Sequence, residues 1–239
     1  TVYYLELPSG VITNMAGDNY VGTAYTFTSQ AYTRKVWGWG YNHSGALGQN
    51  STSIDYYSSP VQVPGTDWGY AEGKIDVSQY RFLSIKTDGT LWGMGLNSGG
   101  QLGQGDQVSR SSPVQVPGTW SYVSGGGNWT SAINTDGELW MMGASGDGCL
   151  GQNEGGDVER SSPVQVPGTT WSKVFDGQNS ISAIKTDGTL WMWGSNTEGM
   201  LGQNQGPSAQ YSSPVQVGSG TDWSNMGLTS NSWTGVKTD

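Results

Sequence analysis

The sequence predicts an all-β fold made of repeats of about 51 residues. Two motifs recur in constant order at that spacing, and such a period is typical of stacked or radial arrays of one structural unit. Short β-prone runs alternate with tight-turn residues, and no run keeps the 3.6-residue period of a helix. The motifs are Ser-Ser-Pro-Val-Gln-Val, starting at Ser58, Ser111, Ser161 and Ser212, and Leu-Gly-Gln, starting at Leu47, Leu102, Leu150 and Leu201.

Each repeat is expected to form up to four short strands. In the copy that starts at Trp171, the β-prone runs cover 171–175, 182–194 around a Thr-Asp-Gly turn, and 212–217. Asp-Gly between apolar runs favours a tight hairpin, because its turn needs a positive φ that glycine adopts without a Cβ clash. Asn-x-x-Gly and Pro-Gly sequences mark the other turns of the repeat.

We expect residues 1–239 to form one array, with repeats at 12–67, 68–119, 120–170 and 171–222 and a partial repeat from 223–239 and 1–11. The segment around Leu5 aligns with the last strand of a repeat, and Asp239 lies halfway through a hairpin. Ends of this kind would leave unpaired strand edges, which native sheets avoid. The sequence therefore predicts a segment of a longer chain, or an array that is closed by another chain.

Composition and charge exclude several functional classes. Ten Lys and Arg residues stand against 19 Asp and Glu residues, giving a net charge of −9. Nucleic-acid binding needs a basic face, so we expect no nucleic-acid partner. No apolar run is long enough to span a membrane, so we expect no membrane insertion. A single cysteine cannot form an internal disulfide, which leaves the redox compartment open.

The 12 tryptophans fall mainly into two series that occupy equivalent positions in successive repeats. A large ring at the same position in every unit is most simply a packing residue between neighbouring units, and burial of each ring would contribute about 2–3 kcal/mol. We therefore assign structural roles to one series made of Trp37, Trp92, Trp140 and Trp191, and to another made of Trp68, Trp120, Trp171 and Trp223.

Residues outside this regular pattern are the candidates for binding. The loops between Leu-Gly-Gln and Ser-Ser-Pro differ among repeats, and variable loops on a constant scaffold are how repeat proteins present a binding face. Neutral variation in exposed turns is the alternative interpretation. The candidates are Trp39, Trp129, Trp193 and Trp233, which lie outside the two series, with Glu154, Asp157, Arg160 and Tyr211 from the variable loops.

No catalytic, metal or cofactor site is expected. Gly146 to Gly151 matches a dinucleotide-binding pattern, but that pattern requires a strand before it and a helix after it, and here it coincides with the repeat's own turn. His43 and Cys149 occupy variable turn positions. A single histidine supports neither a Ser-His-Asp triad nor a zinc site of ordinary spacing. The acidic cluster that includes Glu154, Asp157 and Glu159 lacks the spacing of a calcium loop.

The repeat resembles that of the regulator of chromosome condensation family, as seen in Ala183–Gly194, Asn196–Gln203 and Ser213–Val217. The resemblance covers essentially the whole chain and implies a β-propeller with four-stranded blades around a central channel. The nearly identical Ser-Ser-Pro-Val-Gln-Val-Pro-Gly copies look most similar to bacterial and bacteriophage members.

The chain departs from the residues that carry two activities of that family. It has no inserted β-wedge of the kind used for nucleotide exchange on a small GTPase, and no Gly-Trp-Arg-His-Thr motif of the kind used in ultraviolet-B reception. A histidine is common in the family three residues before the alanine of the Ser-x-Ala strand. That position holds Arg81, Trp129, Ser180 and Ser232 in this chain.

We expect a non-enzymatic structural and binding module, set in an extracellular or virion-surface appendage such as a phage tail or fibre. Its partners would be proteins, or a surface receptor or glycan, within a larger assembly. Two alternatives stay open. One is an intracellular regulatory scaffold or nucleotide-exchange propeller, and the other is a secreted carbohydrate-active enzyme.

Overall fold

The computed structural model describes residues 2–5, 25–28, 33–51, 55–78, 80–206, 210–229 and 232–238. The chain divides into two compact units, Thr1–Thr33 and Arg34–Asp239. The first unit contains the antiparallel pair β1 (Val2–Leu5) and β2 (Tyr25–Thr28). Within the described ranges, no helix has the length and apolar character needed to cross a membrane.

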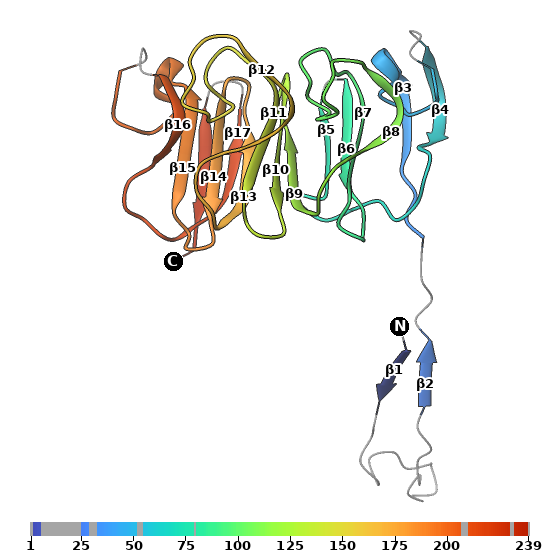
Figure 1. Cartoon of the computed structure of the whole chain (residues 1–239). Helices are drawn as coiled ribbons and strands as arrows, with labels where there is room; N and C mark the ends of the chain where they lie inside the picture. The colour runs from blue at the N-terminus through green and yellow to red at the C-terminus, as the bar shows by residue number, and fades with distance from the viewer. Residues whose placement is uncertain are drawn as a thin grey trace, which may run out of the picture. The chain divides into compact units, whose positions relative to one another are not determined.

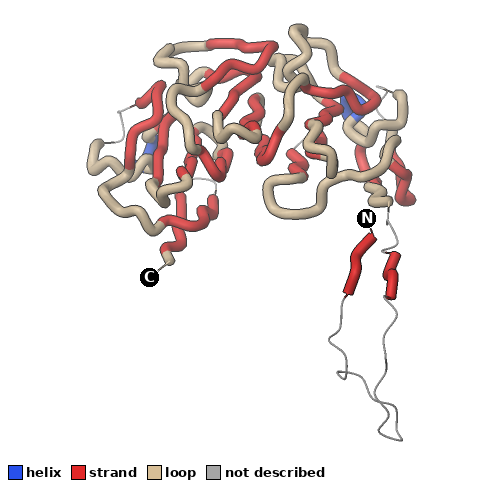
Figure 2. The backbone as a smooth tube through the Cα atoms, turned by 60° about the horizontal axis from the view of Figure 1, so that its bottom comes forward, coloured by secondary structure: helices blue, strands red, loops and turns tan. Residues whose placement is uncertain are grey.

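The second unit consists of five antiparallel sheets that follow one another along the chain (Figure 1). We call these sheets blades I to V. In Figure 2 the blades succeed each other along an arc. Their strands are, for blade I, β3 (Trp37–Tyr41) and β4 (Tyr56–Gln62); for blade II, β5 (Ile75–Ser78), β6 (Arg81–Ile85), β7 (Leu91–Gly95) and β8 (Arg110–Val116); for blade III, β9 (Trp120–Gly125), β10 (Trp129–Asn134), β11 (Leu139–Ser145) and β12 (Val158–Gln165); for blade IV, β13 (Trp171–Asp176), β14 (Ser180–Lys185), β15 (Leu190–Ser195) and β16 (Gln210–Gln216); and for blade V, β17 (Trp223–Leu228) and β18 (Trp233–Lys237).

This arrangement confirms the all-β prediction and gives blades II to IV the expected four strands. The helical elements of the described residues are two 3-10 turns, η1 (His43–Gly45) and η2 (Thr197–Gly199). The first strands of successive blades contact one another, β5 with β9 and β9 with β13. Since β6 also packs on β9 and β10 on β13, the hydrophobic core lies between consecutive blades.

A repeated hairpin joins the second and third strands of blades II and IV. In blade II, Asp88 Oδ1 accepts hydrogen bonds from the backbone N–H of Thr90, at 3.0 Å, and from its hydroxyl, at 2.6 Å. Asp187 and Thr189 repeat both bonds in blade IV. The Thr-Asp-Gly-Thr sequence therefore closes its own turn, as its Asp-Gly dipeptide predicts.

A second repeated device explains the Leu-Gly-Gln motif. In blade II, the side-chain amide of Gln104 donates to Leu102 O and to Gln115 O, both at 3.0 Å, and so ties the turn to the fourth strand of its own blade. Asn97 Oδ1 accepts from the N–H of Leu102 at 2.8 Å. The same glutamine bond to the fourth strand occurs at Gln49, Gln152 and Gln203.

The residue that follows the glutamine joins one blade to the next. Its backbone N–H donates to the first serine of the next Ser-Ser-Pro, with lengths of 2.8, 2.7 and 2.8 Å for the three described pairs. The pairs are Asn50 to Ser111, Gly105 to Ser161, and Asn153 to Ser212. Both motifs of the sequence thus meet at one joint between blades, which accounts for their shared spacing.

The buried tryptophans of the second series pack in the cores between consecutive blades, as Trp120 does between blades II and III and Trp171 between blades III and IV. Trp68, Trp120 and Trp171 are buried, whereas Trp92, Trp140, Trp191 and Trp223 are half-buried and Trp37 is exposed. The rings of Trp171 and Trp191 meet edge to face, with centroids 6.1 Å apart and planes at 78°. Aromatic pairs prefer this geometry over a face-to-face stack.

Candidate functional site

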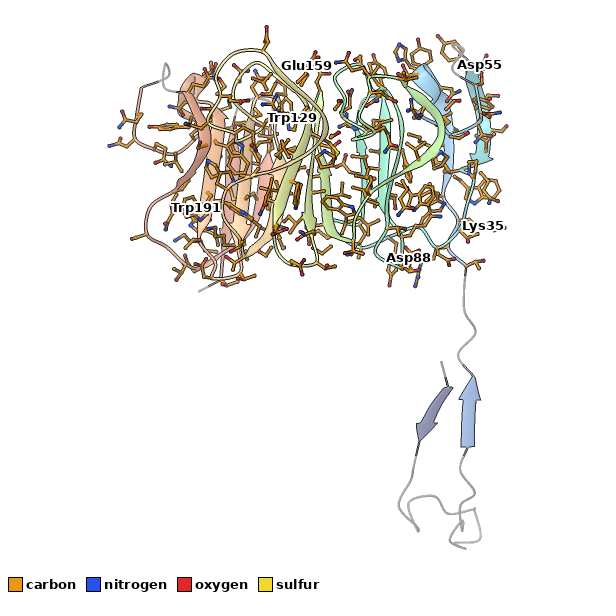
Figure 3. The ribbon with its side chains drawn as sticks, viewed as in Figure 1. Lys35, Asp55, Asp88, Trp129, Glu159 and Trp191 are labelled. Carbon is orange, nitrogen blue, oxygen red and sulfur yellow. The ribbon has the colours of Figure 1, made fainter. Side chains whose placement is uncertain are left out.

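The propeller unit has two opposite faces. We define the loop face as four segments, each of which connects the last two strands of a blade and includes the adjoining strand ends. Their described residues are 42–51 with 55–57, 97–110, 145–160, and 196–206 with 210–211. The hairpin face consists of the hairpins 86–90, 134–138 and 185–189 with the Val-Pro-Gly turns beside them. Figure 3 shows Asp55 and Glu159 at the edge of the loop face, and Asp88 and Lys35 at the opposite edge.

The loop face is strongly acidic. Its four segments contain seven carboxylates but only two guanidinium groups, Arg110 and Arg160, and no lysine. Because clefts and faces of one charge sign attract ligands of the opposite sign, this face favours a basic partner. The carboxylates are Asp55, Asp106, Asp147, Glu154, Asp157, Glu159 and Glu198.

Both arginines of the loop face are held within their own loops. Arg110 pairs with Asp106 at 2.6 Å, and Arg160 pairs with Glu154. Both pairs are partly exposed, so each contributes little to stability, and their main effect is to shape the loop. Arg160 pairs across the strands with Gly143, and Tyr211 with Gly194, so these two predicted residues occupy equivalent positions in blades III and IV.

A hydrogen bond connects the loops of two neighbouring blades. Gln107 of blade II donates its side-chain amide to Glu159 Oε2 of blade III. Asp157, in the same loop as Glu159, is exposed. The loops of blades II and III therefore form one continuous acidic surface, of which Glu154 and Asp157 are exposed members.

The structure buries two of the tryptophans that we considered for binding. The Trp193 side chain is 0% exposed, and its indole N–H donates to Cys149 O at 2.7 Å. Trp129 is 5% exposed and belongs to the same hydrophobic core. Neither ring offers a stacking surface, because β10 and β15 are buried along most of their length and both rings lie in the core between blades.

The other aromatic candidates differ from these. Trp233 is half-buried, and its indole N–H donates to Ser180 Oγ at 2.9 Å, which joins blade V to blade IV. Tyr211 is half-buried and packs against the cores on both sides of blade IV. Trp39 on β3 is 65% exposed. Of these three rings, Trp39 has the largest exposed fraction.

A buried ionic cluster lies between the inner strands of blades II, III and IV. The Arg81 side chain is buried, and its Nη2 donates to Trp129 O at 2.8 Å and to Gly126 O at 3.1 Å. Asp76 and Asp176 both interact electrostatically with this guanidinium. Asp176 also accepts a hydrogen bond of 2.7 Å from Ser131 Oγ. The cluster thus joins three consecutive blades.

Two carboxylates and one guanidinium give this cluster an excess of negative charge when all are ionised. Burial, assisted by the neighbouring Asp76 carboxylate, raises the pKa of Asp176 to about 7 against the opposing effects of Ser131 and Arg81. Burial also raises the pKa of Asp76 and lowers that of Arg81 to about 10. Buried like charges favour the neutral form of one partner, so Asp176 titrates near neutral pH.

The sequence held a partial signal for this cluster. Arg81 occupies the position three residues before the alanine slot, where the other repeats have Trp129, Ser180 and Ser232, so its departure from the pattern was visible. Its partners were not predicted. Asp76 and Asp176 lie in first strands of different blades, 100 positions apart, and only the radial arrangement brings them to one guanidinium.

The described residues include no group of three or more histidine, cysteine, aspartate or glutamate side chains arranged to hold a metal ion. Cys149 is buried, and burial raises the pKa of its thiol to about 12. Because the thiolate is the reactive form, this cysteine is not an activated nucleophile.

Two segments of the chain, 88–133 and 187–236, match the family model of the regulator of chromosome condensation (RCC1) repeat. The ultraviolet-B receptor UVR8 of Arabidopsis thaliana is 28% identical over 188 residues, which are 77% of this chain and 42% of the receptor. These two segments are therefore similar to RCC1 repeats, in agreement with the resemblance found in the sequence.

Solved structures show the same fold. Yeast RCC1 (Prp20) bound to Kap60 has a TM-score of 0.68 at 15% identity, covering 91% of this chain and 57% of that one. Human WBSCR16 has a TM-score of 0.64 at 22% identity, covering 79% and 50%. The chain thus has an RCC1-like propeller fold and spans about half the length of these relatives.

Proposed function

We propose that this chain is a non-enzymatic propeller module that binds a protein partner through its acidic loop face. The partner surface would be rich in lysine and arginine. The observation that carries the proposal is the contrast between a fixed scaffold and its variable loops. The joints between blades repeat with lengths of 2.7 to 2.8 Å, whereas the loops that start from them differ in sequence and concentrate carboxylates.

Relatives with this fold support a protein-binding role. Yeast RCC1 (Prp20) was crystallised with Kap60, and the Prp20p structure was described together with its binding to Gsp1p and histones. Histones are basic proteins, so Prp20p is an example of a protein with this fold that binds a basic partner. For this chain, the acidic loop face is the region with the complementary charge.

Two biological settings are compatible with such a module. The first is an extracellular or virion-surface appendage of bacterial or phage origin, which the regular repeats and the low content of charged residues, 12%, favour. The second is a regulatory propeller scaffold, which the relationship to UVR8 and yeast RCC1 favours equally. A glycan or receptor as partner belongs to the first setting.

Charge-neutralising variants of the two faces test the proposal. The loop-face variant carries Glu154→Gln, Asp157→Asn and Glu159→Gln, and the hairpin-face control carries Asp88→Asn, Asp136→Asn and Asp187→Asn. Both remove three negative charges. An asparagine carbonyl can still accept the threonine bonds that Asp88 and Asp187 accept in the wild type.

The wild type and both variants would be immobilised and exposed to an extract of the source organism at the same salt concentration. The proteins that each one retains would then be compared. We expect one main partner to bind the wild type and the hairpin-face variant but not the loop-face variant. A partner that binds all three proteins equally would contradict a role for the loop face.

A further inference from the structure

The hairpin face contains a corner of two tryptophans that appears in blades II, III and IV. In blade II the ammonium of Lys86 lies over both rings, 4.6 Å from the centroid of Trp68 and 4.5 Å from that of Trp92. In blade IV, Lys185 repeats this at 4.7 Å from Trp171 and 4.6 Å from Trp191. The chain itself therefore shows which chemical group these corners accept, an ammonium on an alkyl stem.

Blade III has the two rings but lacks the lysine. Trp120 and Trp140 hold the ring positions, and Asn134 takes the place of Lys86 and Lys185. These three residues line a pocket of about 240 Å³. The rest of its lining consists of Pro117, Gly118, Thr119 and Pro163. A lysine side chain would fit in a pocket of this size, so the corner is open where its equivalents are filled.

The glycine of the Val-Pro-Gly turn marks where the ammonium would lie. The Nζ atom of Lys86 lies 3.4 Å from the ideal Cβ position of Gly65, and that of Lys185 lies 3.5 Å from the one at Gly168. At Gly118 of blade III, the nearest atoms are those of the Trp120 ring, at 3.3 Å. The space beside Gly118 is thus bounded by aromatic surface.

The charge of blade III also changes in the direction that favours a cation. The hairpins of blades II and IV both read Lys-Thr-Asp-Gly-Thr and are neutral overall. The blade III hairpin reads Asn-Thr-Asp-Gly-Glu and carries two negative charges. Asn134 Nδ2 donates to Glu138 Oε2 at 2.7 Å, which keeps that carboxylate beside the pocket-lining Asn134. An ammonium in the corner would compensate these charges.

We propose that the corner formed by Trp120 and Trp140 binds the side chain of a lysine, unmodified or methylated, that a partner protein presents. The partner's alkyl stem would lie against Pro117 and Pro163, and its ammonium would face the two rings with Glu138 nearby. This site is on the hairpin face and is independent of the acidic loop face.

Ligand titrations with a small probe test the site directly. The probe is Nα-acetyl-lysine methylamide, its Nε-trimethyl form is the methylated counterpart, and its neutral Nε-acetyl form is the control. Binding would be followed by the indole N–H signals of the whole chain in two-dimensional NMR spectra. We expect the two cationic probes to shift the signals of Trp120 and Trp140, and the neutral probe to leave them unchanged.

Exchange of the hairpin sequences between blades provides a reciprocal control. The variant Asn134→Lys with Glu138→Thr converts the blade III hairpin to the Lys-Thr-Asp-Gly-Thr found in blades II and IV, so folding should be retained. Its own lysine would fill the corner, and we expect the affinity for the probe to fall about tenfold or more, as loss of a cation–π contact with two rings implies.

The opposite exchange, Lys185→Asn with Thr189→Glu, opens the corner of blade IV. We expect this variant to gain a second site, seen as new shifts of the Trp171 and Trp191 signals. Equal binding of the cationic and neutral probes, or unchanged binding after the blade III exchange, would overturn the proposal. The loop-face variant should bind the probe normally, so the outcome is separate from that of the proposed function.

Discussion

The environment of the Asp176 carboxyl group is formed by residues that are distant from it in the sequence. It ends the first strand of blade IV, yet its partners Ser131 and Arg81 come from blades III and II. Burial is the main cause of its raised pKa, and the Asp76 carboxylate adds to it. This residue links the stability of the propeller to pH.

The sign of that link follows from the shift. The pKa of Asp176 is about 7 in the folded protein and near the ordinary aspartate value of 3.8 when the chain is unfolded. Ionisation therefore costs the native state more, so the free energy of unfolding falls between about pH 4 and pH 7, by up to about 1.4 kcal/mol per pH unit for one proton. Asp176→Asn should remove the part of this fall that Asp176 contributes and stabilise the protein at pH 7.

Denaturant unfolding from pH 4 to pH 8 checks this prediction. The variant Asp106→Asn is a suitable control, because Asp106 is only partly buried on the loop face and its pKa is lowered by its bonds to Val108 and Arg110. A wild type and an Asp176→Asn variant with the same pH dependence would show that Asp176 does not carry the effect.

Trp171 offers a second prediction at the residue scale. Its ring is 2% exposed and contacts the rings of Trp191 and Trp193. Trp171→Ala should lower the free energy of unfolding by about 3–5 kcal/mol, as for other buried aromatic residues. Trp39→Ala, at an exposed ring, should cost less than about 1 kcal/mol. Equal losses in equilibrium unfolding would mean that Trp171 does not pack as described.

At the scale of elements, the turn that precedes Leu-Gly is the part that joins the blades. Gly100 has a φ of +85°, and a Cβ there would lie 2.5 Å from Ser161 Cα of the next blade. Gly199 has a similar φ of +78°, but no atom lies within 4 Å of its Cβ position. A side chain at either position would be strained by the positive φ, but only a side chain at Gly100 would also clash with the neighbouring blade.

Alanine at these two positions separates strain from packing between blades. Gly100→Ala should destabilise the chain by about 1–3 kcal/mol more than Gly199→Ala, because only the former overpacks a joint. The comparison would be made by thermal and denaturant unfolding of both variants. Equal destabilisation by the two variants would show that the turn at Gly100 does not pack tightly against the next blade.

The strands and turns could be predicted from the sequence because their signals are local. The Asp-Gly hairpins and the Ser-Ser-Pro strands lie where their motifs indicate, and the blades have the expected four strands where all four are described. The hydrogen bonds between the two motifs of neighbouring blades could not be predicted. The bond from Gly105 to Ser161 connects a turn with a strand that is distant in sequence, and only the assembled array reveals it.

The candidate site was predicted only in part, because local features are visible in the sequence and contacts between distant segments are not. Variable loops and their charges are visible in the sequence, so Glu154, Asp157 and Arg160 were found there. Burial depends on tertiary packing, so Trp193 and Trp129 were chosen for lying outside a pattern, and the structure places both in the core. The cluster around Arg81 forms only through contacts between three blades, so its members could not be identified together from the sequence.

At the scale of the whole molecule, the proposed function assigns stability to the scaffold and recognition to the loop face. The joints and tryptophan corners maintain the scaffold, and the loop face can vary because its carboxylates are exposed or only weakly paired. The variant with Glu154→Gln, Asp157→Asn and Glu159→Gln should therefore unfold within about 0.5 kcal/mol of the wild type. A larger loss of stability would show that the acidic loop is part of the scaffold.

The central claim is that partners bind at the loop face, and site-specific photo-crosslinking tests it most directly. A photoreactive residue would be placed at Asp157 or Glu198 on the loop face, and at Asp187 on the hairpin face as the control. We predict that both loop-face positions crosslink to the same basic protein partner and that the control position does not. Crosslinks to that partner only from the hairpin-face position would contradict the account.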